Sequence, residues 1–118
     1  MSKSKHTEND FFSLVFEVVK LIPKGKVTSY GAIAKYLGTP KSARMVGYAM
    51  NASHQSKDKI PAHRVLNRNG LLTGRFHFNP PELMQELLEK ENIKIENHQV
   101  QDFEKVFWNP SEELDLLK

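Results

Sequence analysis

The fold of this chain is decided by the stretch Ile60-Pro61-Ala62-His63-Arg64-Val65, which runs directly into Leu66-Asn67-Arg68-Asn69-Gly70. An apolar segment that meets an Asn-Arg-Asn-Gly turn predicts a short strand entering a β-hairpin. We expect the second strand to run from Leu71 to Phe76 or Phe78. The His and Arg at the start of the first strand would then lie beside a pocket.

Two short helices are expected before this stretch. The first runs from Gly31 to Leu37 and is broken at Gly38-Thr39-Pro40, and the second runs from Ala43 to about Met50 behind a possible Ser42 cap. Two short helices joined by a tight turn predict a helix-turn-helix, and a following hairpin makes it winged. The expected fold class is therefore α+β, mainly helical, with a winged helix-turn-helix of the kind that binds DNA.

The flanking segments complete the expected domain plan. Residues 1–10 are expected to be disordered, residues 11–92 to form the winged-helix domain, and residues 93–118 to form an acidic extension packed on the same domain. Helical spacing predicts a core helix at the start of the domain, with Phe12, Val15, Phe16, Val19 and Leu21 or Ile22 on its buried face. A helix over 82–91 is expected to turn Leu83, Leu87 and Leu88 inward. The apolar residues of the extension either dock it on the core or form a partner-binding patch; they are Phe103, Val106, Phe107 and Trp108.

Charge is divided unevenly along the chain. Residues 1–81 hold 13 Lys and Arg against 4 Asp and Glu, a net charge of +9, whereas residues 82–118 hold 4 against 10, a net charge of −6, which together give +3. A basic body indicates a polyanionic partner, although basic residues can also simply solvate a surface. The chain has no cysteine, so disulfides and thiolate metal sites are excluded.

The segment Met1 to Asp10 is polar, and no apolar run approaches the ~18 residues of a membrane span. We therefore expect a soluble intracellular protein, in the cytoplasm at the nucleoid of a bacterium or in the nucleus of a eukaryote, with no membrane partner.

Pro61-Ala62-His63-Arg64-Val65 resembles the active-site motif Pro-x-His-Arg-Val of the O6-alkylguanine-DNA alkyltransferases, in which x is the acceptor Cys. Two further motifs resemble that family in the same order: Val27-Thr28-Ser29-Tyr30-Gly31 before the helix-turn-helix, and Ala43-Arg44-Met45-Val46-Gly47-Tyr48-Ala49-Met50 in its recognition helix. The likeness covers about residues 11–92. Because Ala62 replaces the acceptor Cys, the chain resembles in particular the alkyltransferase-like proteins.

The resemblance implies how DNA would be bound. In the family the recognition helix enters the minor groove, an Arg at the position of Arg44 enters the base stack while the target nucleotide rotates out, and a Tyr at the position of Tyr30 contacts that nucleotide. Tyr48 stands where the human-type enzyme has Gly. The residues expected to contact DNA are Tyr30, Lys41, Arg44, Gly47, Ala49 and Arg64. Those expected to form the lesion pocket are Tyr30, Met50, Ala62 and Val65. The segment Thr73 to Phe78 only loosely resembles the family's Gly-rich loop and is left out of the pocket.

The resemblance also assigns a relay without its nucleophile. In the enzymes a His activates the Cys through a water and is oriented by a Glu, and these residues correspond to His63 and Glu91. A methyl side chain cannot accept an alkyl group, so no catalytic residue is expected. No cofactor is expected. No metal site is expected either, because the remaining histidines show no ligand spacing; they are His6, His54, His77 and His98.

The function implied is that of a non-enzymatic, monomeric sensor. It would bind O6-alkylguanine in double-stranded DNA by minor-groove docking and base flipping, and mark the lesion for nucleotide excision repair proteins. One alternative is an alkyltransferase inactivated by a Cys-to-Ala change. A second is a winged-helix regulator with no lesion preference, and a third is a protein-interaction module built on the acidic tail.

Overall fold

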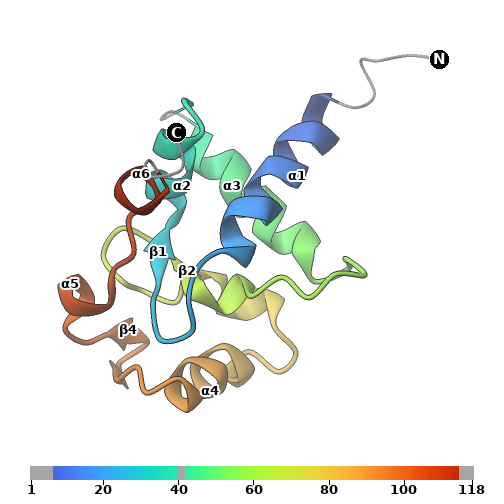
Figure 1. Cartoon of the computed structure of the whole chain (residues 1–118). Coiled ribbons are helices and arrows are strands. Elements are labelled where there is room, and N and C mark those ends of the chain that lie inside the picture. The colour runs from blue at the N-terminus through green and yellow to red at the C-terminus, as the bar shows by residue number, and fades with distance from the viewer. Residues whose placement is uncertain (1–6, 40–41, 115–118) are drawn as a thin grey trace.

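A computed structural model describes residues 7–39 and 42–114, and it is mainly helical (Figure 1), in agreement with the expected α+β class. The helices are α1 (Thr7–Lys20), α2 (Tyr30–Tyr36), α3 (Ala43–Ser53), α4 (Glu82–Lys90), α5 (Phe103–Val106) and α6 (Pro110–Glu113), with 3-10 helices η3 (Ala62–Arg64) and η4 (Thr73–His77). The strands are β1 (Thr28–Ser29), β2 (Val65–Leu66), β3 (Ile95–Glu96) and β4 (Gln99–Val100). No helix of the described part is long and apolar enough to cross a membrane.

Helix α1 lies beside α3 and buries one face against it (Figure 1). Val15, Val19 and Ile22 are almost fully buried, whereas Leu21 is 53% exposed, so Ile22 is the residue that completes the face. The helix begins at Thr7, which corrects the expectation of disorder for residues 7–10. Residues 1–6 of that segment lie outside the described residues.

The two helices of the expected helix-turn-helix are present and pack on each other. The side chain of Ser29 caps α2, because its Oγ accepts a hydrogen bond of 3.1 Å from the amide of Ala32. Gly38 has a positive φ of 82° just after α2 ends, a conformation that glycine adopts without strain. Ser42 occupies the cap position of α3 but makes no side-chain cap hydrogen bond.

The expected β-hairpin after η3 is not formed. The turn itself is present, with Gly70 at a φ of 77° and Oδ1 of Asn67 accepting hydrogen bonds of 2.9 Å from the amides of Asn69 and Leu71. Strand β2, however, pairs in parallel with β1, placing Val65 beside Thr28.

The segment after the turn takes other partners instead of returning along β2. Leu71 forms an antiparallel bridge with Gln99, the amide of Leu72 donates to the carbonyl of His98 at 2.9 Å, and residues 73–77 coil into η4. The expected strand from Leu71 to Phe76 or Phe78 was therefore wrong, because the C-terminal segment supplies the backbone partners that a hairpin would have supplied.

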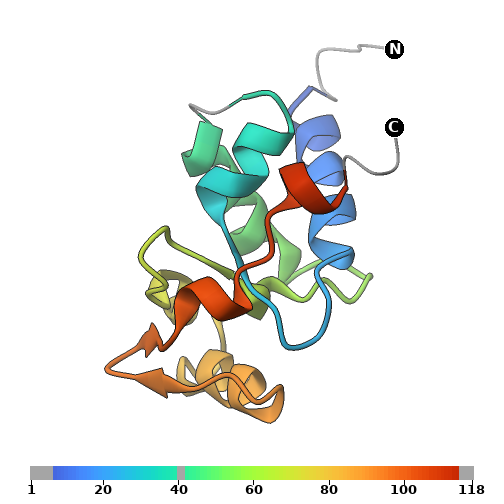
Figure 2. The same ribbon diagram turned by 60° about the vertical axis from the view of Figure 1, so that its left-hand side comes forward.

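The C-terminal segment is built into the same body as the helices. Strands β3 and β4 form a hairpin whose turn residues Asn97 and His98 have positive φ values of 53° and 62°. Further on, the amide of Val27 donates to the carbonyl of Val106 at 2.9 Å, and the amide of Trp108 donates to the carbonyl of Val27 at 2.7 Å. We call residues 106–108 the strap. Beyond it, α6 packs against α2 (Figure 2).

Two apolar clusters form the core. The larger joins α1, α2 and α3 to Trp108, which is 7% exposed, and the smaller lies around α4 and the β3–β4 hairpin. On α4 the buried residues are Met84 and Leu88, so Leu88 lies inward as expected. Leu83 and Leu87 are only partly buried, and Met84 takes the inward position that was expected of them. Phe103 and Val106 pack against the smaller cluster.

Candidate nucleic-acid interface

A cleft of about 410 Å³ lies between α3, η4 and the first residue of α2. We call it the α3–η4 cleft. Its lining residues are Tyr30, Ala43, Arg44, Gly47, Tyr48, Asn51, Thr73, Gly74 and His77. Three residues expected from the sequence to contact DNA, Tyr30, Arg44 and Gly47, are therefore brought to one place by two helices and a turn.

The amphipathic pattern of α3 decides which of its side chains reach the cleft. Val46, Ala49 and Met50 are buried, while Arg44 and Asn51 are exposed on the opposite face. Ala49 was expected to contact DNA, but it has no exposed surface and packs in the larger core cluster. That expectation was wrong because the helical period turns position 49 inward with position 46.

Residues of η4 were left out of the site by the sequence reasoning, yet Thr73, Gly74 and His77 line the cleft. A Cβ at Gly74 would lie 3.1 Å from the hydroxyl oxygen of Tyr30, so glycine lets this segment approach the tyrosine closely. The loose likeness of the segment to a Gly-rich loop was the signal that could have placed it here.

The remaining residues expected to form the lesion pocket are buried. Met50, Ala62 and Val65 are 4%, 6% and 1% exposed, and all three belong to the larger core cluster. None of them is among the residues that line the α3–η4 cleft. Lys41, another expected DNA contact, lies outside the described residues.

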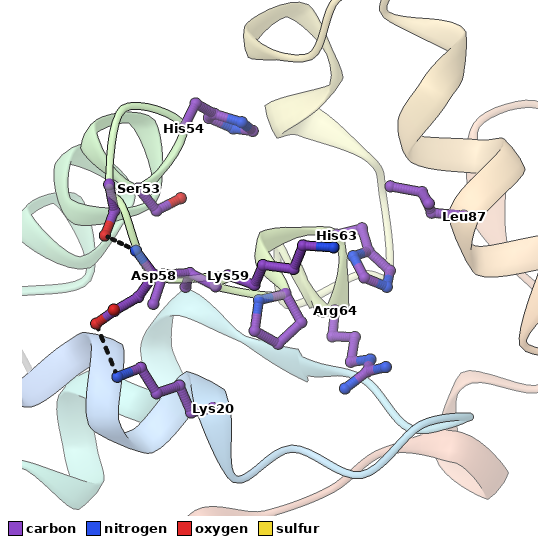
Figure 3. A pocket seen from close by; sticks show the side chains of 11 residues that line it. Lys20, Ser53, His54, Asp58, Lys59, His63, Arg64 and Leu87 are labelled. Atoms are coloured by element: carbon purple, nitrogen blue, oxygen red, sulfur yellow. Dashed lines mark hydrogen bonds and ion pairs between the residues drawn. The ribbon is translucent and has the colours of Figure 1, made fainter.

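A second cleft, of about 550 Å³, opens beside η3, and we call it the η3 cleft (Figure 3). In Figure 3 the Lys59 side chain extends over η3 towards His63, and Leu87 reaches into the same space from α4. At the rim, Nζ of Lys20 pairs with Oδ2 of Asp58 at 3.1 Å. Pro61 and His63 line this cleft, but Ala62 between them does not.

His54 is the residue at which α3 ends. It lines the η3 cleft, and its ring meets Phe78 edge-on with the centroids 4.5 Å apart. Burial lowers the pKa of His54, and the nearby charge of His77 lowers it further. The neutral form of His54 is therefore favoured.

The expected relay pair is formed next to the η3 cleft. Nε2 of His63 lies 2.8 Å from Oε2 of Glu91. Because a carboxylate can only accept, Nε2 carries the proton and Nδ1 is left as an acceptor. Burial lowers the pKa of His63 below its ordinary value, although the hydrogen bond to Glu91 opposes this shift.

Glu91 also holds Arg64. Nε of Arg64 donates to Oε1 at 3.0 Å, Nη2 donates to Oε2 at 2.7 Å, and Nη1 donates to the carbonyl of Ile22 at 2.8 Å. The amide of Gly25 also donates to Oε1, at 3.1 Å. Burial by itself raises the pKa of Glu91, but the hydrogen bonds from Arg64, His63 and Gly25 outweigh it and lower the pKa to about 2.

Arg64 consequently has a structural task in this arrangement. Its side chain is 16% exposed, and its guanidinium donates to the carboxylate of Glu91 and to the carbonyl of Ile22, in the turn after α1. It is not among the residues that line the α3–η4 cleft with Arg44. A direct contact of Arg64 with DNA stays a prediction.

Within residues 7–39 and 42–114, no group of three or more His, Asp or Glu side chains is placed to hold a metal ion.

Comparison with known proteins agrees with this arrangement. The family model of the 6-O-methylguanine DNA methyltransferase DNA-binding domain matches residues 10–93. Alkyltransferase-like protein 1 of Schizosaccharomyces pombe is 38% identical over 87 residues, which are 74% of this chain and 80% of that protein. The DNA base-flipping protein of Escherichia coli K12 is 32% identical over 104 residues, which are 86% of this chain and 77% of that protein.

A solved structure extends the likeness to the fold. The crystal structure of S. pombe Atl1 in complex with damaged DNA that contains O6-carboxymethylguanine superposes with a TM-score of 0.76 and 33% identity. The match covers 86% of this chain and 97% of the other.

Proposed function

This chain belongs to the 6-O-methylguanine DNA methyltransferase family, and from that premise we propose that it is a non-enzymatic DNA-binding protein that recognises O6-alkylguanine in duplex DNA. The observation that carries the proposal is the meeting of Tyr30 and Arg44 at one cleft in a chain without cysteine. Transfer of an alkyl group to a cysteine of this chain is excluded, so removal of the lesion falls to other proteins. Nucleotide excision repair is the pathway we propose.

Docking would place α3 in the minor groove with its exposed face towards DNA. The guanidinium of Arg44 would fill the space left when the damaged nucleotide rotates out, because it can both stack and hydrogen-bond. The hydroxyl of Tyr30 would contact the rotated nucleotide, and Gly47 would let the helix backbone approach the groove. The structural complex of S. pombe Atl1 with damaged DNA supports DNA as the partner.

The lesion pocket would use the buried residues behind the cleft. We propose that main-chain carbonyls of Ala62 and Val65 accept from the exocyclic amine of guanine and that Met50 packs against the base. The carbonyl of Ala62 already accepts a hydrogen bond from the amide of Val65, but a carbonyl oxygen has two lone pairs and can accept a second. The small side chain of Ala62 would leave more room for substituents on O6 than a cysteine would.

Binding would depend on salt. The net charge of +9 on residues 1–81 attracts phosphates, and each phosphate contact releases counterions. Lys24, Lys26, Lys35 and Lys41 are the lysines we propose for such contacts. We further propose that the protein acts as a monomer inside the cell, in the cytoplasm of a bacterium or the nucleus of a eukaryote.

The test is binding to one short duplex that carries either guanine or O6-methylguanine at a single position, at fixed salt. We expect a preference of about tenfold or more for the lesion, equivalent to about 1.4 kcal/mol. Arg44→Ala should erode that preference, because it removes the group that fills the stack. Lys35→Ala, the matched control on α2, should weaken binding to both duplexes alike. Equal affinity of the wild-type protein for both duplexes would leave a helix-turn-helix DNA binder without lesion preference.

The intact pair of His63 and Glu91 favours one second candidate, an alkyltransferase inactivated at Ala62. Incubation of Ala62→Cys with DNA carrying a labelled O6-methyl group decides between the two. Stoichiometric label on the protein, lost again in Ala62→Cys with His63→Ala, would support the inactivated enzyme. An unlabelled variant that still binds the lesion would support the non-enzymatic protein.

A further inference from the structure

Tyr48 is a large aromatic residue on the solvent-exposed face of α3. Its side chain is 48% exposed and lines the α3–η4 cleft together with Arg44 and Asn51. These three residues lie at positions i, i+4 and i+7, so they form one stripe along the outer face of the helix. The opposite face is already filled by Val46, Ala49 and Met50, which are buried in the core. The ring of Tyr48 therefore faces outward for reasons of helical geometry.

The spacing of this stripe sets which part of a duplex each residue would meet. A helix rises ~1.5 Å per residue, so Tyr48 lies about 6 Å further along α3 than Arg44. Successive base pairs are stacked about 3.4 Å apart along the DNA axis. With α3 in the groove and Arg44 at the damaged nucleotide, Tyr48 would meet the base pairs beside the lesion.

We propose, on the basis of the function proposed above, that Tyr48 is a second minor-groove contact that makes lesion binding depend on the neighbouring base pairs. The minor groove is only about 6 Å wide, so a tyrosine ring beside the helix has to widen it. The cost of widening depends on the sequence, because pyrimidine–purine steps such as TA deform easily and G·C-rich steps do not. The guanine amine also projects into the groove at G·C pairs and takes up room there.

Two features of the site support this assignment. Gly47 precedes Tyr48 on the same face and carries no side chain, so nothing at that position holds the helix away from the groove. The phenolic hydroxyl of Tyr48 can both donate and accept, while its ring can pack against deoxyribose, as aromatic residues do at half-wet interfaces. The bulk of the Tyr48 ring makes binding depend on the neighbouring base pairs, and its hydroxyl adds affinity.

The experiment uses four duplexes, with guanine or O6-methylguanine at one position and with either A·T pairs in TA steps or G·C pairs on both sides. Wild-type protein should bind the lesion between A·T pairs at least about fivefold more tightly than the lesion between G·C pairs. Tyr48→Ala should reduce this ratio to within about twofold while keeping a preference for the lesion over guanine. Tyr48→Phe should keep the ratio, because it keeps the ring.

Leu14→Ala is the matched control, since Leu14 is a similarly exposed apolar residue, 54% exposed, on α1. It should leave all four affinities unchanged, and circular dichroism should show all variants folded.

Two outcomes overturn the role of Tyr48 alone: a wild-type protein that prefers the lesion but ignores its neighbours, or a Tyr48→Ala variant that keeps the full neighbour dependence. A wild-type protein that binds lesion and guanine equally in both contexts would instead overturn the proposed function.

Discussion

Nε2 of His63 lies 2.8 Å from Oε2 of Glu91, and the two side chains come from η3 and from the residue that ends α4. The same carboxylate binds Arg64 and the amide of Gly25, in the turn after α1. One buried carboxylate therefore ties three segments together. In a chain without a thiol to activate, this geometry gives His63 and Glu91 a role in stability.

Removal of the charge of Glu91 should destabilise the fold. Glu91→Gln leaves the guanidinium of Arg64 without a counter-charge where both side chains are mostly buried. We expect a loss of about 2–4 kcal/mol in the free energy of unfolding, measured with urea at pH 7.5. Glu89→Gln, an exposed carboxylate on the same helix, should change it by less than about 0.5 kcal/mol. Equal effects of the two changes would refute the role of Glu91 as a tie.

Stability should fall in acid in two steps. The pKa of Glu91 is lowered from 4.5 to about 2 in the folded protein, so its contribution is complete above pH 4.5 and is lost as the pH falls towards 2. The folded pKa of His63 is also lowered, from 6.5, so the unfolded chain takes up this proton first and stability declines as the pH falls below 6.5.

Urea unfolding at several pH values between 7.5 and 3 would measure both steps. His63→Gln should make the curve less steep between pH 6.5 and 5, because the amide can still donate to Glu91 but does not titrate. The lowered pKa of His54 leaves a smaller slope in this range. The steep loss below pH 4.5 should remain in this variant. A wild-type curve that is flat from pH 7.5 to 5, or a loss at high pH, would contradict the assigned shifts.

Gly74→Ala should disturb DNA binding more than folding. The added Cβ would lie 3.1 Å from the hydroxyl oxygen of Tyr30, so the tyrosine has to move by a few tenths of an ångström. We expect a roughly three- to tenfold loss of affinity for the lesion duplex with a change in unfolding free energy below about 1 kcal/mol. Gly31→Ala is the control, because its Cβ meets no atom within 4 Å. Unchanged lesion affinity in Gly74→Ala would show that the hydroxyl position of Tyr30 is unimportant.

Trp108→Ala should loosen the strap as well as the core. Trp108 is 7% exposed and belongs to the larger cluster. We expect the substitution to lower the free energy of unfolding by about 3–5 kcal/mol. Hydrogen exchange should also quicken at the amide of Val27, whose acceptor is the carbonyl of Val106. Val15→Ala is the control, because it removes a buried side chain from the larger cluster, as Trp108→Ala does, and none from the smaller cluster that contains Val27. In this variant, exchange at Val27 should quicken only as far as the loss of global stability requires.

Local sequence patterns predicted helices and turns well, and they predicted the pairing of the strands poorly. The period of α1, the two helices of the helix-turn-helix and the turn at Asn67–Gly70 each depend on residues close in sequence, and each is present. The pairing of β2 depends instead on residues far away in sequence. Val65 of β2 pairs with Thr28 of β1, which lies 37 positions earlier. Turn chemistry alone favours a hairpin and carries no information about such competition.

The candidate site shows the same division. Motif likeness placed Tyr30, Arg44 and Gly47 at one surface, and the structure brings all three to the α3–η4 cleft. It also suggested a surface role for Ala49, which the helical period turns into the core. The close approach of Gly74 to Tyr30 is a tertiary contact across 44 positions, and no spacing rule in the sequence reveals it.

The strap has a consequence for the order in which the protein can fold as it is made. Val27 pairs with Phe107, 80 positions later, so one edge of the small sheet stays open until residue 107 has been made. At about 5–20 residues per second, the ribosome adds Trp108 roughly 4–16 s after Val27. The helix-turn-helix can collapse early, but the strand that leads into Tyr30 has backbone partners on both sides only after residue 108 has left the ribosome. In nascent chains stalled before position 106, the strand that precedes α2 should therefore lack the backbone partners of Val27.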